Sequence, residues 1–132
     1  MKPTVLIVED HDVMRATLRD WLGSALPDCL LLEAGSGEEA INLVRTHMPP
    51  VVLMDIGLPR MNGIETTRWI KALAPEVQVV MLTIHEASVY QRDAEAAGAS
   101  GYVLKRKMHS DLVPVVAELL KNGKNGEVRS EK

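Results

Sequence analysis

The sequence has little of what would place it outside the ordinary globular classes. Cys29 is the only cysteine among 132 residues, so no intramolecular disulfide can form, which fits a reducing cytosol. No apolar run approaches the length of a membrane span. The N-terminal run turns acidic at Glu9 and Asp10, which is not typical of a secretion signal. Internal repeats are also absent, and we expect a cytoplasmic protein that does not enter a membrane.

Positive charge of the kind that coats a nucleic acid is missing as well. The net charge is −3, and the one basic triplet, Lys105-Arg106-Lys107, is too short for the clustered contacts of non-specific DNA binding. The length and an apolar content of 46% fit one domain with a single core. We expect this domain to cover residues 1–121. The biased polar segment 122–132 is interpreted as a tail or the start of a linker.

Short apolar runs alternate with segments of helical spacing. The apolar runs predict strands at Thr4–Val8, Cys29–Glu33, Val51–Met54, Val77–Leu82 and Gly101–Leu104. The segments between them predict helices at Val13–Leu26, Gly37–His47, Gly63–Leu73 and Ser88–Ala97. A last helix is expected from about Asp111 to Lys121, with Ser110 as its N-cap and Pro114 in its first turn.

This alternation predicts an α/β fold. Strands connected through helices form a parallel sheet with right-handed crossovers and helices on both faces. Five such units suit the flavodoxin-like, doubly wound five-stranded sheet of order 2-1-3-4-5, with five helices. In that order the first and third strands are neighbours. Functional groups collect beyond the carboxyl ends of the strands, near the point where the strand order reverses.

Charged and hydroxyl side chains stand where the predicted strands end. Glu9 and Asp10 follow the first strand, Asp55 the third, Thr83 the fourth and Lys105 the fifth. Taken singly, each acid could be an ordinary cap or turn residue. Carboxylates that meet in one crevice repel one another, and a hard divalent cation such as Mg²⁺ relieves that repulsion through oxygen ligands. Their joint placement therefore predicts a Mg²⁺ site beside a reactive carboxylate.

Four segments carry a resemblance to a known family: VLIVED, DIGLPRMNG, VVMLT and AGASGYVLK. The second fits the pattern D-x-x-L-P-x-M-x-G. Through these segments the chain, from Thr4 to about Leu120, resembles the receiver domain of two-component response regulators, whose fold is called CheY-like. VLIVEDHDVMRATLRDWL and GASGYVLK are most similar to the NarL/FixJ subfamily, whose regulators carry a C-terminal LuxR-type helix-turn-helix.

The resemblance implies a metal and an acceptor. Asp55 is the expected acceptor of a phosphoryl group delivered by a sensor histidine kinase. Asp10, Asp55 and the backbone carbonyl of Gly57 are expected to bind Mg²⁺ directly, and Glu9 to bind it through a water. A carboxylate is a competent nucleophile for such a transfer, which depends mostly on positioning and charge neutralisation. We expect a phosphoacceptor that catalyses only its own phosphoryl transfer and dephosphorylation, and not an enzyme.

The resemblance also implies the residues that read the phosphoryl group. Thr83 is expected to hydrogen-bond it, Lys105 to pair with it, and Tyr102 to be the switch aromatic that turns inward as Thr83 moves. The helix after Thr83 has only Val89 and Tyr90 as large apolar anchors, so we expect it to be weakly held and to take part in the switch.

The sequence departs from the family pattern after Lys105. Many receivers have a proline there, often after a cis bond, and this chain has Arg106, which leaves the conformation of that bond open.

Three kinds of protein could contain such a domain, and they differ in how the signal is passed on. The subfamily likeness favours the N-terminal half of a transcriptional regulator, which would contact DNA only through an output domain absent from this chain and could form a homodimer on phosphorylation. A stand-alone receiver that signals by protein contact is the alternative. A small Mg²⁺-dependent phosphatase with an aspartyl nucleophile is disfavoured, because its second acid two residues further on is replaced by Gly57.

Overall fold

Strands and helices alternate along the whole chain. The computed structural model describes residues 2–86 and 88–130, and for Ser88 and residues 122–130 only the backbone. The strands are β1 (Thr4–Val8), β2 (Leu30–Ala34), β3 (Val51–Asp55), β4 (Gln78–Thr83) and β5 (Gly101–Leu104). The helices are α1 (Asp12–Ala25), α2 (Gly37–His47), α3 (Gly63–Leu73), α4 (Ser88–Ala96) and α5 (Met108–Ser130), and a 3₁₀ turn, η1 (Lys105–Lys107), joins β5 to α5.

The strands form one parallel sheet in the order β2-β1-β3-β4-β5. This confirms the predicted flavodoxin-like, CheY-like topology. β1 lies between β2 and β3, so the strand order reverses beside it. Val8 is opposite Met54 on β3, and the carboxyl ends of β1 and β3 therefore lie next to each other. That edge of the sheet carries the acidic residues.

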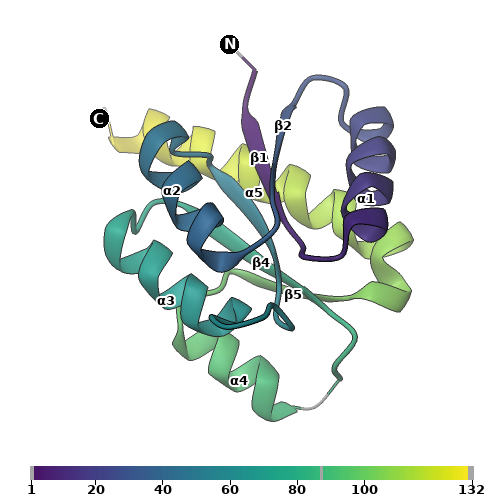
Figure 1. The fold of residues 1–132 in the computed structure, drawn as a ribbon. Helices are drawn as coiled ribbons and strands as arrows, with labels where there is room; N and C mark the ends of the chain where they lie inside the picture. The colour runs from purple at the N-terminus through teal and green to yellow at the C-terminus, as the bar shows by residue number, and fades with distance from the viewer. Residues whose placement is uncertain (1, 87, 131–132) are drawn as a thin grey trace.

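Helices cover both faces of the sheet. α1 and α5 lie on one face, and α2, α3 and α4 lie on the other (Figure 1). Successive side chains of a strand point to opposite faces. Leu6 and Val8 accordingly pack into the core under α2–α4, while Val5 and Ile7 pack into the core under α1 and α5. Burial on both faces explains why the inner positions of the central strands are apolar, as in VLIV of β1, VVLM of β3 and VVML of β4.

The helix starts follow from local capping. The Asn62 side chain accepts a hydrogen bond from the Glu65 N–H at 2.9 Å, and the Glu65 side chain accepts one from the Asn62 N–H, which forms a capping box before α3. Ser36 Oγ caps α2 in the same sense by accepting from the Glu39 N–H. Both helices begin and end at the predicted residues.

Two strand starts differ from the prediction by one residue. The Cys29 N–H donates to the carbonyl of Leu26 at 3.0 Å, and the Val77 N–H donates to that of Ala74 at 3.0 Å. Each residue therefore closes a turn, and β2 and β4 begin at the following residue. β2, β3 and β4 each end one residue later than predicted, at Ala34, Asp55 and Thr83.

The start of α5 is the larger correction. This helix begins at Met108, so Ser110 lies inside it and is not its N-cap; its hydroxyl donates to the Lys107 carbonyl at 3.1 Å. Pro114 consequently lies beyond the first turn. Met108 and Leu112 are both buried one helical turn apart, and this contact explains the earlier start.

The backbone of residues 122–130 continues α5, whereas the sequence indicates a polar tail; residues 131–132 lie outside the described part. That a linker begins there stays a prediction. Within the described residues, no helix has both the length and the apolar composition that crossing a bilayer requires.

Candidate functional site

Three carboxylates meet at the carboxyl edge of the sheet. Glu9 and Asp10 follow β1 and Asp55 ends β3. One oxygen from each of them lies within 4.8 Å of the others. The neighbouring positions of β1 and β3 bring them together, as the strand order predicts. Carboxylate oxygens clustered in this way are the donor set that Mg²⁺ takes in proteins.

Lys105 reaches into the same cluster from η1. Its Nζ lies 2.8 Å from Glu9 Oε1 and 3.6 Å from Asp55 Oδ1. The Glu9 side chain is only 3% exposed, that of Asp55 13% and that of Lys105 16%. Charges this far from water are stable only when they are paired. The ammonium therefore neutralises part of the acidic cluster.

Thr83 lies at the end of β4, beside the cluster. Asp55 is opposite Leu82 in the register of β3 and β4, so Thr83 lies one residue further toward the carboxyl edge. The Thr83 side chain is buried, and its Oγ1 accepts a hydrogen bond from the N–H of His85 at 3.1 Å. The hydroxyl thus anchors the start of the β4–α4 loop.

Two glycines that follow Asp55, Gly57 in the loop and Gly63 at the start of α3, have different amounts of space around them. The N–H of Gly57 donates to Asp55 Oδ1 at 3.2 Å, and a Cβ at Gly57 would have ordinary contacts. A Cβ at Gly63 would lie 2.1 Å from the backbone oxygen of Asp55 and 2.8 Å from Ile56 Cα. Gly63 therefore permits α3 to begin directly against the end of β3. The sequence predicts that a helix begins at Gly63 but does not reveal this close approach to β3.

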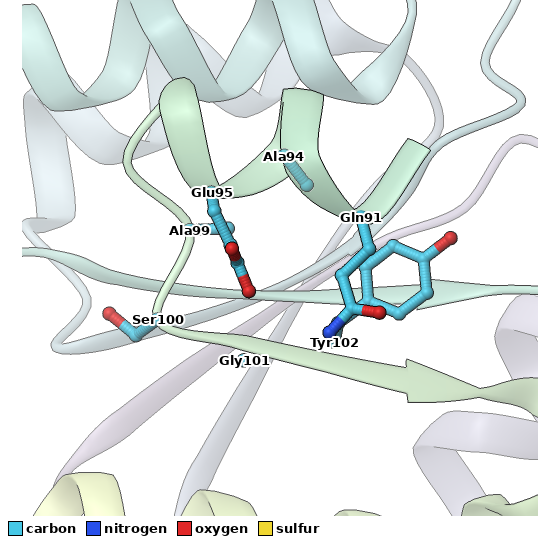
Figure 2. Close-up of a pocket in the computed structure, with 7 residues that line it drawn as sticks. All are labelled: Gln91, Ala94, Glu95, Ala99, Ser100, Gly101 and Tyr102. Carbon is cyan, nitrogen blue, oxygen red and sulfur yellow. The ribbon is translucent and has the colours of Figure 1, made fainter. Parts of the chain in front are cut away.

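Tyr102 connects β5 to the β4–α4 loop. Its hydroxyl donates to the backbone carbonyl of His85 at 2.7 Å. Burial raises the pKa of Tyr102, while the nearby Thr83 hydroxyl acts in the opposite direction. The phenol therefore stays a hydrogen-bond donor through the physiological pH range. Its ring lies beside Gln91 of α4, at one side of a hollow of about 260 Å³ between α4 and β5 (Figure 2).

The expectation about the anchors of α4 is wrong in its details. Val89 and Tyr90 are 50% and 37% exposed, so neither is an anchor, and Ala94 and Ala97 are the buried residues instead. The ring of Tyr90 packs on that of His85, with centroids 4.7 Å apart. α4 is thus attached to the sheet by even less apolar area than the sequence suggests.

The turn after Lys105 needs no proline. No cis peptide bond occurs in the described part of the chain, and the Lys105–Arg106 bond is trans. η1 provides the change of direction. Arg106 Nη2 lies 2.6 Å from Glu86 Oε1, so this turn makes a second contact with the β4–α4 loop.

The family model of the response regulator receiver domain matches residues 5–117. The chain belongs to this family. Curated relatives agree: the transcriptional activator protein ExaE of Pseudomonas putida is 35% identical over 116 residues, which are 88% of this chain and 54% of ExaE. The response regulator UvrY of Escherichia coli K12 is 35% identical over 112 residues, 85% of this chain and 51% of UvrY. This receiver domain thus spans about half the length of the curated relatives it matches.

Solved structures support the same family. A LuxR-family two-component response regulator from Aurantimonas sp. SI85-9A1 matches with a TM-score of 0.84 and 32% identity, covering 92% of this chain and 87% of that one. A CheY-like receiver domain protein from Methanospirillum hungatei JF-1, 22% identical with a TM-score of 0.88, shares the fold over 96% of this chain and 99% of its own. Receiver domains are signalling modules that take phosphate from sensor kinases and generally bind Mg²⁺ at an acidic pocket, and this receiver has such a pocket at Glu9, Asp10 and Asp55.

Proposed function

We propose that Asp55 is the phosphoacceptor of this receiver. An Asp55 carboxylate oxygen attacks the phosphorus of a kinase phosphohistidine, the P–N bond breaks, and the imidazole leaves with the electron pair. The main support is the cluster of carboxylates: one oxygen each of Glu9, Asp10 and Asp55 lies within 4.8 Å of the others. In addition, Lys105 Nζ lies 3.6 Å from Asp55 Oδ1. A small donor such as acetyl phosphate would serve in the same way, with acetate as the leaving group.

The residues present suit Mg²⁺. Asp10, Asp55 and the Gly57 carbonyl would hold the ion directly, and Glu9 would hold it through a water. Oxygen donors alone, with few direct carboxylates, are the preference of this cation. When bound, Mg²⁺ supplies positive charge against the phosphoryl oxygens in the crowded acidic pocket.

The remaining charges and donors come from the neighbouring strands. The Lys105 ammonium pairs with a phosphoryl oxygen, which it can reach from its present place beside Asp55. The Thr83 hydroxyl donates to another phosphoryl oxygen. Because that hydroxyl now accepts from the His85 N–H, its movement pulls on the β4–α4 loop. Tyr102, bonded to the His85 carbonyl, follows the loop and is the switch aromatic.

In this proposal, phosphorylation of the receiver regulates transcription through a second domain of the whole protein. The relatives include transcriptional regulators, and this chain covers about half of each. We place the receiver in the N-terminal half of a cytoplasmic regulator, followed by a DNA-binding output domain and paired as a homodimer when phosphorylated. Reading the gene beyond codon 132 tests the first part: a helical DNA-binding unit is expected, and a stop codon would leave the stand-alone receiver.

Intact mass after incubation with acetyl phosphate tests the acceptor. We expect a gain of one phosphoryl group in the wild-type chain with Mg²⁺ and none after removal of Mg²⁺ by EDTA. Asp55→Asn is expected to remain unlabelled, because an amide oxygen is a poor nucleophile. Circular dichroism of Asp55→Asn controls for its fold.

Other results would change the proposal. Labelling of Asp55→Asn to the wild-type extent would exclude Asp55 as the acceptor. Continuous release of phosphate from small phosphate esters over many turnovers would favour the aspartyl-nucleophile phosphatase. That enzyme normally needs a second acid as general acid for the leaving group, and this chain has Gly57 at that position.

A further inference from the structure

The guanidinium of Arg15 joins three parts of the molecule beside the acidic pocket. From α1, its Nη1 donates to the backbone carbonyl of Glu9 at 2.8 Å, and its Nη2 donates to Asp12 Oδ1 at 2.9 Å. Its Nε donates to Glu33 Oε1 on β2 at 3.3 Å. The side chain is 21% exposed. One planar group thus holds the end of β1, the start of α1 and the edge strand together.

The Glu9 carbonyl is the point where β1 leaves the sheet. The N–H of Glu9 still donates to the Ala34 carbonyl of β2 at 3.0 Å. The next peptide, which joins Glu9 to Asp10, has its oxygen on Arg15. Because a peptide group is planar, a fixed oxygen fixes the orientation of the whole unit that leads into Asp10.

The carboxylates of Glu9 and Asp10 differ in their hydrogen bonds. The Glu9 carboxylate bonds to Lys105 through one oxygen and accepts from the His11 N–H through the other, at 3.2 Å. The Asp10 side chain is exposed and makes no hydrogen bond among the residues that the structure describes. Its direction therefore depends on its backbone. The Glu9 carboxylate holds the peptide after Asp10 through the His11 N–H, and Arg15 holds the peptide before Asp10.

We propose that Arg15 is a positioning residue for the metal site: it holds the Glu9–Asp10 peptide so that the Asp10 carboxylate faces Asp55. This inference rests on the proposed function, in which Asp10 binds Mg²⁺ directly. Arg15 does not touch the metal or the phosphoryl group. Groups that orient metal ligands in this way affect affinity although they stand outside the ligand set.

Arg19 offers a matched control. It lies one helical turn further along α1, and its Nη1 is 3.1 Å from Glu33 Oε2. Its other contact is Asp20, so it shares the Glu33 partner and the charge of Arg15 without touching the loop of Glu9 and Asp10. Arg19→Met and Arg15→Met remove the same charge from the same helix, and only the second removes the bond to the Glu9 carbonyl.

Calorimetric titration with Mg²⁺ alone, without a phosphodonor, tests the proposal. We expect Arg15→Met to bind Mg²⁺ about tenfold more weakly than the wild type, and Arg19→Met to bind it like the wild type. Arg15→Lys keeps the charge and loses the three-way fork, so it should recover only part of the affinity. If Arg15→Met does not fold, Arg15→Lys decides, since it must still bind more weakly than the wild type.

A role through charge alone has the opposite sign. Removing a cation near the pocket would strengthen Mg²⁺ binding, so unchanged or tighter binding by Arg15→Met would overturn the proposal. Equal weakening in Arg19→Met would overturn it too. The test also separates failure of the proposed function from failure of this inference. If the wild-type chain binds no Mg²⁺, both the proposed function and the role of Arg15 are excluded. If the wild-type chain binds Mg²⁺ and is labelled, and the Arg15 variants behave like it, only the role of Arg15 is excluded.

Discussion

Single residues at strand ends account for most of the site. Asp55 closes an otherwise buried strand, and Lys105 Nζ lies 3.6 Å from it. The sequence could predict that Asp55, Thr83 and Lys105 lie close together, because the carboxyl ends of neighbouring parallel strands lie along the same edge of the sheet. It could not reveal Arg15, since the role of that residue depends on a long side chain that folds back over a loop.

At the residue scale, we predict that Tyr102→Phe separates labelling from response. The variant loses the hydroxyl that donates to the His85 carbonyl. Because this bond lies outside the acidic pocket, Asp55 should still be labelled at the wild-type rate. The phosphorylation-dependent change in amide hydrogen exchange across α4 should shrink.

Tyr90→Phe is the matched control for Tyr102→Phe. Tyr90 is the other tyrosine, it is 37% exposed, and its hydroxyl makes no hydrogen bond among the described residues. Its exchange response should equal that of the wild type. An undiminished response in Tyr102→Phe would show that the hydroxyl does not transmit the signal.

At the scale of elements, β3 and α3 approach each other closely at their junction. A Cβ at Gly63 would lie 2.1 Å from the Asp55 carbonyl oxygen, and backbone cannot give way as a flexible side chain does. We predict that Gly63→Ala lowers the free energy of unfolding by about 3 kcal/mol, measured by urea denaturation. The labelling of Asp55 should slow as well, because its strand end is displaced.

Gly57→Ala is the comparison for that change. The nearest atom to a Cβ there is Asp55 Oδ1 at 3.9 Å, which is ordinary contact. Its free energy of unfolding should stay within about 0.5 kcal/mol of the wild type. Equal effects of the two alanines would mean that the approach of α3 to β3 is not the cause.

Element boundaries could be predicted where local chemistry determines them. α2 and α3 begin after Ser36 and Asn62, which are side-chain caps that the sequence displays. The start of α5 depends instead on the burial of Met108 against the sheet, a tertiary contact that overrides the cap signal of Ser110. The exposure of Val89 and Tyr90 likewise depends on how α4 is turned, which periodicity in an alanine-rich segment does not determine.

For the whole molecule, the strand order could be predicted because the alternation of strands and helices and the right-handed crossover rule leave few possible topologies.

The extent of the domain can be tested directly. Val116 is fully buried, and Leu119 and Leu120 pack against the same core. We predict that a chain ending at Lys121 keeps its free energy of unfolding within about 0.5 kcal/mol of the full chain.

A chain ending at Val113 provides the contrast to that truncation. It lacks Val116, Leu119 and Leu120, and should lose at least about 2 kcal/mol of stability. Both chains are compared by urea denaturation. A large loss on truncation at Lys121 would place residues 122–132 in the domain and not after it.

The bond between Lys105 and Glu9 has a consequence for the whole site. The acidic pocket already holds a counter-ion of its own, an ammonium 2.8 Å from Glu9. Three carboxylates and one ammonium leave two negative charges uncompensated, and the proposed divalent cation would supply the charge that Lys105 does not. Because Lys105 belongs to the chain, the pocket would keep this part of its compensation whether or not the metal is bound.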